Sequence, residues 1–185
     1  MTRFHIGLDI GKKRDPAAIA IVEKADMLQV RHLERMPLGT HYPAIVERAR
    51  AIVNHFPLAG RCALVVDATG VGEPVVDMLR AARIGCEITA VTITGGEREH
   101  RSGPSTSVPK RDLIAGLQVL LEQGELKIAR SMRDTGALIR ELMDIRSATL
   151  SAEGHGRHDD LVIALALACW RARRKEIGYV NRPLF

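Results

Sequence analysis

Residues 4–11 read FHIGLDIG, and this stretch decides how the chain begins to fold. Apolar side chains occupy every even position from 4 to 10, which is the two-residue period of a β-strand. Asp9 falls among the odd positions and therefore points away from the apolar set. A turn over residues 12–16 is expected after this first strand.

Two more apolar runs follow, over residues 17–22 and 27–36. The charged residues between them, Lys24 and Asp26, are typical of a hairpin tip. The three runs together predict three consecutive antiparallel strands. Residues 42–56 carry apolar side chains spaced for one face of a helix, so a helix is expected next.

The middle of the chain predicts a strand, helix, strand unit. Residues 62–66 form a continuous apolar run that ends at Asp67, as in a central strand covered on both faces. A glycine-rich turn, a short helix, a second strand and a long mobile loop are expected next, over residues 68–72, 74–82, 87–93 and 94–108.

The last part of the chain predicts mainly helices. Pro109 suits the first turn of a helix that Gly124 ends. A short segment, a helix, an extended stretch and a strongly apolar helix follow, over residues 126–129, 135–143, 145–152 and 159–170. These elements predict an α/β fold with a central mixed five-stranded sheet, its first three strands antiparallel, and helices on both faces.

The composition indicates one globular domain with an excess of basic residues. A length of 185 residues suits a single core, and 46% hydrophobic with 26% charged residues excludes a disordered or fibrous chain. The net charge of +5 favours a polyanionic partner, although a basic domain without such a partner explains the charge equally well. Aromatic residues make up only 3%, which argues against base stacking and leaves backbone contacts as the way to hold nucleic acid.

The cysteines and the apolar runs bear on the compartment. The chain has three cysteines and no CxxC pair, which argues against a disulfide framework and against a zinc–thiolate site. No apolar run reaches the length of a secretory core or a membrane span. We therefore expect a soluble cytoplasmic protein without membrane contacts.

Four aspartates stand where the predicted elements would present them: Asp9, Asp67, Asp159 and Asp160. If the first strand and the 62–66 strand are neighbours and the last helix packs across the sheet, these carboxylates meet in one pocket. Oxygen-only ligands select magnesium or manganese, and two such ions about 3.5–4 Å apart activate water and stabilise the leaving oxygen of a phosphodiester. Each aspartate also has a purely structural interpretation, as a turn residue before Gly11 or Gly70 or as a helix N-cap.

Four segments, in this order, resemble the nuclease domain of bacteriophage terminase large subunits: GLDIGKKRDPAAIAIV at 7–22, LVVDATGVGEPVVDML at 64–79, VPKRDLIAGLQVLLEQGELKI at 108–128 and HDDLVIALALA at 158–168. The resemblance covers nearly the whole chain. It implies a ribonuclease H-like fold related to Holliday junction resolvases, with residues 1–176 as the single nuclease domain and 177–185 as an irregular tail. It also implies metal-dependent endonuclease cleavage of double-stranded DNA in viral genome packaging, with two Mg²⁺ or Mn²⁺ ions, in a bacterial cell or phage-infected host.

The resemblance also implies roles for single acids. Asp9 matches the first-strand acid that bridges both metals, Asp67 the acid after the buried strand, and Asp160 the acid of the last helix. Asp160 is preferred to Asp159 as the direct ligand because it immediately precedes the apolar helix. Asp159 would bind the second metal or cap the helix.

Basic residues near these acids are candidates for contacts with DNA phosphates. Lys110 opens the helix after the long loop, where the family keeps a basic residue, and a solvated surface lysine is its structural alternative. Arg98, Arg101 and Arg111 extend the same basic region. His158 would orient a ligand or touch phosphate, unless it is an exposed turn histidine.

The sequence contains no GxxxxGK followed by Ser or Thr, the phosphate-binding loop of the ATPase that complete terminase large subunits carry. No ATPase domain is therefore expected, and a separate packaging ATPase, the portal or the small terminase subunit are the protein partners that the resemblance implies. Two alternatives stay open: a Holliday-junction-resolvase-like nuclease in recombination or repair, and a non-catalytic module that holds DNA or a partner. Length argues against an actin-like ATPase or sugar kinase, because these enclose a nucleotide between two such domains.

Overall fold

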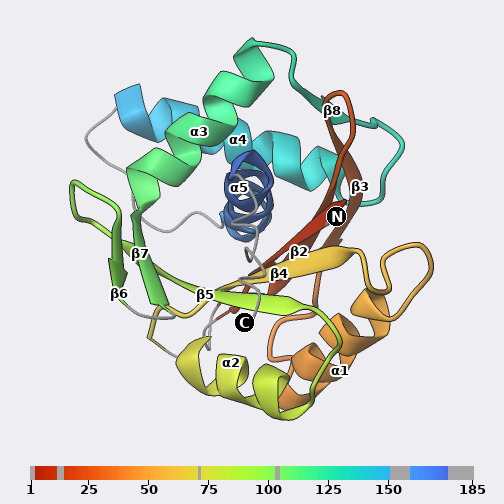
Figure 1. The fold of residues 1–185 in the computed structure, drawn as a ribbon. Coiled ribbons are helices and arrows are strands. Elements are labelled where there is room, and N and C mark those ends of the chain that lie inside the picture. Colours follow the sequence, from red (N-terminus) through yellow and green to blue (C-terminus); the bar gives the residue numbers. More distant parts are fainter. Residues whose placement is uncertain (1–2, 12–14, 71, 103–104, 151–158, 175–185) are drawn as a thin grey trace, which may run out of the picture.

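A mixed sheet with helices on both faces forms the protein (Figure 1). The fold is seen in a computed structural model that describes residues 3–11, 15–70, 72–102, 105–150 and 159–174. Over these residues the sheet has eight strands, in the order β6-β7-β5-β4-β1-β2-β3-β8. The strands are β1 (Phe4–Asp9), β2 (Ala18–Lys24), β3 (Leu28–Arg35), β4 (Cys62–Asp67), β5 (Glu87–Thr94), β6 (His100–Ser102), β7 (Ser105–Pro109) and β8 (Leu126–Ile128).

The central five strands follow the predicted pattern. β1 pairs antiparallel with β2, and β2 pairs antiparallel with β3, as predicted for a three-stranded meander. β4 and β5 then continue the sheet parallel to β1 on its other side. The α/β class, the antiparallel first three strands and the mixed sheet are therefore confirmed.

The predicted number of five strands is wrong, because three short strands extend the sheet at its edges. The segment 94–108, expected to be a loop, contains β6 and β7, and β7 pairs parallel with β5 from Ala90↔Ser105 onward. β8 adds to the other edge, parallel to β3. Strands of three to five residues carry too few alternating positions for a periodic pattern, and the neighbouring strand supplies their hydrogen bonds.

In the described part of the chain, five helices cover the two faces of the sheet (Figure 1). They are α1 (Tyr42–Val53), α2 (Gly72–Ala81), α3 (Lys110–Glu122), α4 (Thr135–Leu150) and α5 (Asp160–Arg173). The helices α1 and α2 pack on one face of the sheet, and α3, α4 and α5 pack on the other. Each face has its own apolar core. The extended stretch predicted over 145–152 is wrong up to residue 150, because α4 continues to Leu150 and no glycine or proline interrupts it after Gly136. Residues 151–152 lie outside the described residues.

The helix α5 lies against the middle of the sheet. It contacts β1 and β2 on one side and α3 on the other, and Figure 1 shows it end-on between the sheet and α3. Its residues from Asp160 to Cys169 are all buried, as expected for a helix that is apolar all round. Gly7 permits this close packing, because a Cβ built on it would lie 1.9 Å from the carbonyl oxygen of Ala164. No helix of the described residues is both long and apolar enough to cross a bilayer.

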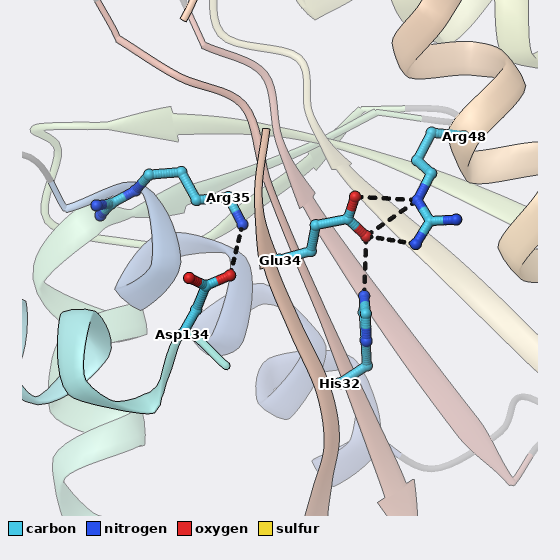
Figure 2. Close-up of polar contacts among 5 residues, drawn as sticks. All are labelled: His32, Glu34, Arg35, Arg48 and Asp134. Carbon is cyan, nitrogen blue, oxygen red and sulfur yellow. Dashed lines mark hydrogen bonds and ion pairs between the residues drawn. The ribbon is translucent and has the colours of Figure 1, made fainter. Parts of the chain in front are cut away.

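A polar network joins the exposed side of β3 to α1 (Figure 2). The Glu34 carboxylate accepts hydrogen bonds from Arg48 on α1, at 2.7 Å from Nη2 and 3.0 Å from Nε. His32 Nε2 lies 2.9 Å from the same carboxylate. Burial alone would raise the pKa of Glu34, but the bonds from Arg48 and His32 outweigh it and lower the pKa.

Glu23 on β2 should make stability depend on pH. Burial alone would raise its pKa, but hydrogen bonds from Arg31, at 2.6 Å, and Arg3 outweigh it, so the pKa lies below its ordinary value of 4.5. A lowered folded-state pKa gives stability that is present above pH 4.5 and lost as the pH falls through the folded value. We expect Glu23→Gln to lower the free energy of unfolding by about 1.5–3 kcal/mol at pH 7. The loss should fall toward the lower end of this range, because both arginines are half exposed.

Urea unfolding of wild type and Glu23→Gln at pH 7 and at pH 3 measures this effect. The difference between the two proteins should shrink at pH 3, because the stability that a lowered folded-state pKa gives is lost progressively as the pH falls below 4.5. Glu47→Gln is the matched control, since Glu47 is 65% exposed and only reaches Arg50 at 3.4 Å. If the free energies of unfolding of wild type and Glu23→Gln differ by the same amount at both pH values, the lowered pKa of Glu23 is contradicted.

Candidate metal centre

The topology brings the predicted acids to one edge of the sheet. Asp9 is the last residue of β1 and Asp67 the last residue of β4. These strands are parallel neighbours in the register Leu8↔Val66, so the two aspartates end them side by side. Asp160 is the first residue of α5, whose packing across β1 delivers its N-terminus to the same edge.

The four predicted aspartates line one pocket of about 270 Å³. We call it the acid pocket, and its lining residues are Asp9, Ile10, Gly11, Asp15, Asp67, Thr69, Ile93, Lys110, Asp159, Asp160 and Ile163. A larger cavity of about 750 Å³, rich in arginine, starts at Arg3 and Phe4, the opposite end of β1. The two cavities share no lining residue. The acid pocket, at the carboxyl ends of β1 and β4, is therefore separate from the arginine-rich cavity.

The backbone around Asp67 holds its side chain in place. Asp67 Oδ1 accepts a hydrogen bond of 2.8 Å from the backbone N–H of Thr69, which closes a tight turn after β4. The Thr69 hydroxyl in turn accepts a 2.8 Å bond from the backbone N–H of Ile93 on β5. The turn after β4 and the neighbouring strand β5 therefore fix the position of Asp67 before any ligand binds.

The electrostatics of the acid pocket favour a cation. Burial and then the charges of Asp67, Asp160 and Asp159 raise the pKa of Asp9 well above its usual value, and Lys110 only partly opposes this. Carboxylate oxygens are the ligands that Mg²⁺ and Mn²⁺ prefer, so the set of donors fits a hard divalent cation.

Two of the acids lie against basic side chains. Lys110 Nζ lies 2.5 Å from Asp159 Oδ2, and Arg35 Nε lies 3.6 Å from Asp160 Oδ2. Within the described part of the chain, no three His, Cys, Asp or Glu side chains are grouped closely enough to hold an ion. Lys110 and Arg35 are therefore the positive charges that a metal ion would compete with at Asp159 and Asp160.

The predicted basic residues separate into one that reaches the acid pocket and three that do not. Lys110, the first residue of α3, lines the pocket. Arg98, Arg101 and Arg111 are exposed outside it, and Arg111 donates a 2.8 Å hydrogen bond to the carbonyl oxygen of Glu97. His158 lies outside the described residues.

Sequence reasoning missed several residues at or beside the acid pocket. Asp15 lines the pocket from the end of the turn after β1. Its closeness to Asp9 in the sequence could have marked it as a further candidate. Glu141 and Arg35 contact the start of α5 from α4 and β3. Nothing in the local sequence of either residue marks it, because only the tertiary fold brings it to Asp160.

A mixed sheet that starts with an antiparallel meander, continues with parallel strands and carries acids at the ends of β1 and β4 is the ribonuclease H-like arrangement. Residues 6–171 match the sequence model of the terminase RNase H-like domain. The chain therefore belongs to the family of terminase RNase H-like domains. No curated protein sequence matches it.

Solved structures of terminase nucleases share this fold. The large terminase nuclease from thermophilic phage G20c with bound magnesium is 27% identical, over 91% of this chain and 81% of that one, with a TM-score of 0.65. The nuclease domain of bacteriophage SPP1 large terminase with bound manganese is 14% identical, over 91% and 86%, with a TM-score of 0.53. The human cytomegalovirus terminase nuclease domain, soaked with manganese and inhibitor-bound, is 11% identical, over 90% and 81%, with a TM-score of 0.60. The chain thus has the fold of a terminase nuclease domain.

Proposed function

We propose that this chain is a Mg²⁺- or Mn²⁺-dependent endonuclease that hydrolyses phosphodiester bonds of double-stranded DNA with two metal ions. The observation that carries the proposal is the acid pocket, where β1, β4 and α5 bring Asp9, Asp67, Asp159 and Asp160 together. Family membership and the metal bound in the G20c nuclease support the same reading.

The acidic residues of the acid pocket would serve as the metal ligands. The carboxylates of Asp9, Asp67, Asp160 and Asp159 would hold the two ions. Bound there, two divalent ions supply a nucleophilic water and stabilise the charge on the leaving oxygen. The Thr69 amide already orients Asp67, so the Asp67 side chain would lose little conformational entropy when an ion binds.

Lys110 would contact a DNA phosphate once Asp159 turns away from it. Its amine is half exposed at the mouth of the acid pocket. We expect Lys110→Gln to weaken DNA binding uniformly across sequences and to reduce the slope of log affinity against log salt by about 1. Fluorescence anisotropy with a labelled duplex in Ca²⁺ measures this, and Lys127→Gln on the distant edge strand β8 is the control. Equal slopes for both variants would remove Lys110 from the DNA contact.

Cleavage of supercoiled plasmid tests the proposed activity. We expect nicked and linear products with Mg²⁺ or Mn²⁺ and none with EDTA. Folded protein that leaves the plasmid intact with every ion would favour a non-catalytic binding module.

The proposed biological role is DNA cleavage during viral genome packaging, in a bacterial cell or phage-infected host. Residues 1–176 would act as the nuclease domain, working with a separate packaging ATPase, the portal or the small terminase subunit. The choice of DNA substrate tests this role: a packaging nuclease should cut linear duplex, whereas a resolvase should prefer a four-way junction and cut it symmetrically.

A further inference from the structure

The first turn of α5 is capped by a residue from another helix. Helix N-termini leave backbone N–H groups without partners, and an Asp at the N-cap normally accepts one of these hydrogen bonds. Asp159 stands at the N-cap but makes no side-chain capping bond. The Glu141 carboxylate on α4 accepts that bond instead, with its Oε2 3.0 Å from the backbone N of Val162.

Glu141 also pairs with the arginine that faces Asp160. Its other oxygen, Oε1, contacts Arg35 Nη2, and Arg35 Nε lies 3.6 Å from Asp160 Oδ2. The side chains of Glu141 and Asp160 are each only 6% exposed, so the charges interact with little screening by water. The backbone N–H of Arg35 donates to Asp134 Oδ2 at 3.2 Å, which fixes the end of β3 against the start of α4 (Figure 2).

We propose that Glu141 and Arg35 are positioning residues that set the metal affinity of the acid pocket. By capping α5, Glu141 leaves the carboxylate of the N-cap residue Asp159 to the pocket. By pairing with Arg35, it also offsets the positive charge that competes with a metal ion for Asp160. This inference rests on the proposed function, because it concerns the same metal ions.

Glu141→Gln tests the charge while keeping the shape. The carboxamide oxygen can still accept the bond from Val162, but the negative charge that offsets Arg35 is gone. Arg35 then faces Asp160 alone, and we expect the affinity for Mn²⁺, measured by titration calorimetry, to fall about 10–100-fold. Glu23→Gln is the matched control: it removes a buried glutamate that pairs with two arginines at the other end of the sheet, and it should leave Mn²⁺ affinity unchanged.

Arg35→Gln changes the affinity in the opposite direction and keeps the test decisive if Glu141→Gln does not fold. Loss of this arginine removes the competitor for Asp160, so Mn²⁺ should bind about threefold or more tightly. Structural damage alone would not tighten metal binding. An Mn²⁺ affinity that is unchanged or weaker in Arg35→Gln would overturn the inference, as would equal losses in Glu141→Gln and Glu23→Gln.

The two proposals fail in different ways. If wild type binds Mn²⁺ and Asp67→Asn does not, the metal centre stands, and the Glu141 and Arg35 variants decide the inference alone. If wild type binds no Mn²⁺, the proposed function fails and the inference fails with it.

Discussion

Asp67→Asn should reduce the rate of plasmid cleavage by about 10³-fold or more, because a bound metal stabilises the transition state by several kcal/mol and each 1.36 kcal/mol is tenfold. The fold should be retained. An asparagine has nearly the same volume, and its carboxamide oxygen can still accept the 2.8 Å bond from the Thr69 N–H. Initial rates with Mg²⁺, together with a thermal unfolding curve, measure both effects.

Asp77→Asn on α2 is the matched control for this experiment. Asp77 is 72% exposed and lies 3.6 Å from Arg80, remote from the acid pocket. We expect its cleavage rate to equal that of wild type and its stability to change by less than about 0.5 kcal/mol. If Asp67→Asn retains wild-type cleavage, Asp67 is not a metal ligand.

Gly7→Ala should cause a large loss of stability. A Cβ at this position would lie 1.9 Å from the Ala164 carbonyl oxygen and 2.9 Å from the Ala168 backbone N, so α5 must move away from β1. Overpacking a core costs about 1–3 kcal/mol and sometimes more, and backbone atoms cannot rotate away as a side chain can. We expect the free energy of unfolding to fall by about 3 kcal/mol, which lowers the unfolding temperature of a chain this size by about 6–12 °C.

Cleavage should fall together with stability in Gly7→Ala, because α5 carries Asp160 into the acid pocket. Gly95→Ala is the control, since a Cβ there meets nothing within 4 Å. Differential scanning calorimetry of both variants checks the prediction. An unfolding temperature for Gly7→Ala within 2 °C of the control, a margin of about 1 kcal/mol or less, would show that the sheet and α5 separate easily.

Strong periodicity explains why much of the sheet could be predicted. β1 to β4 are six to eight residues long and follow clear apolar patterns, and the turn residues between them are charged or glycine-rich. The buried helix α5 was equally clear, because its residues are apolar on every side. These elements carry Asp9, Asp67 and Asp160, so the meeting point of the acids followed from their order along the chain.

The missed features depend on tertiary contacts instead. β6, β7 and β8 form because the edges of the sheet offer hydrogen-bond partners, and their own residues show no alternation long enough to detect. Glu141 looks like any polar residue of an amphipathic helix. Its capping of α5, 21 positions further along the chain, depends on how α4 and α5 pack.

Crystals soaked in Mn²⁺ and measured at a wavelength with a strong manganese anomalous signal would show whether the acid pocket binds metal ions. We expect anomalous peaks in the acid pocket, one of them in contact with both Asp9 and Asp67, and loss of that peak in Asp67→Asn. Anomalous peaks only outside the acid pocket, or no peak at Mn²⁺ concentrations that support cleavage, would contradict it.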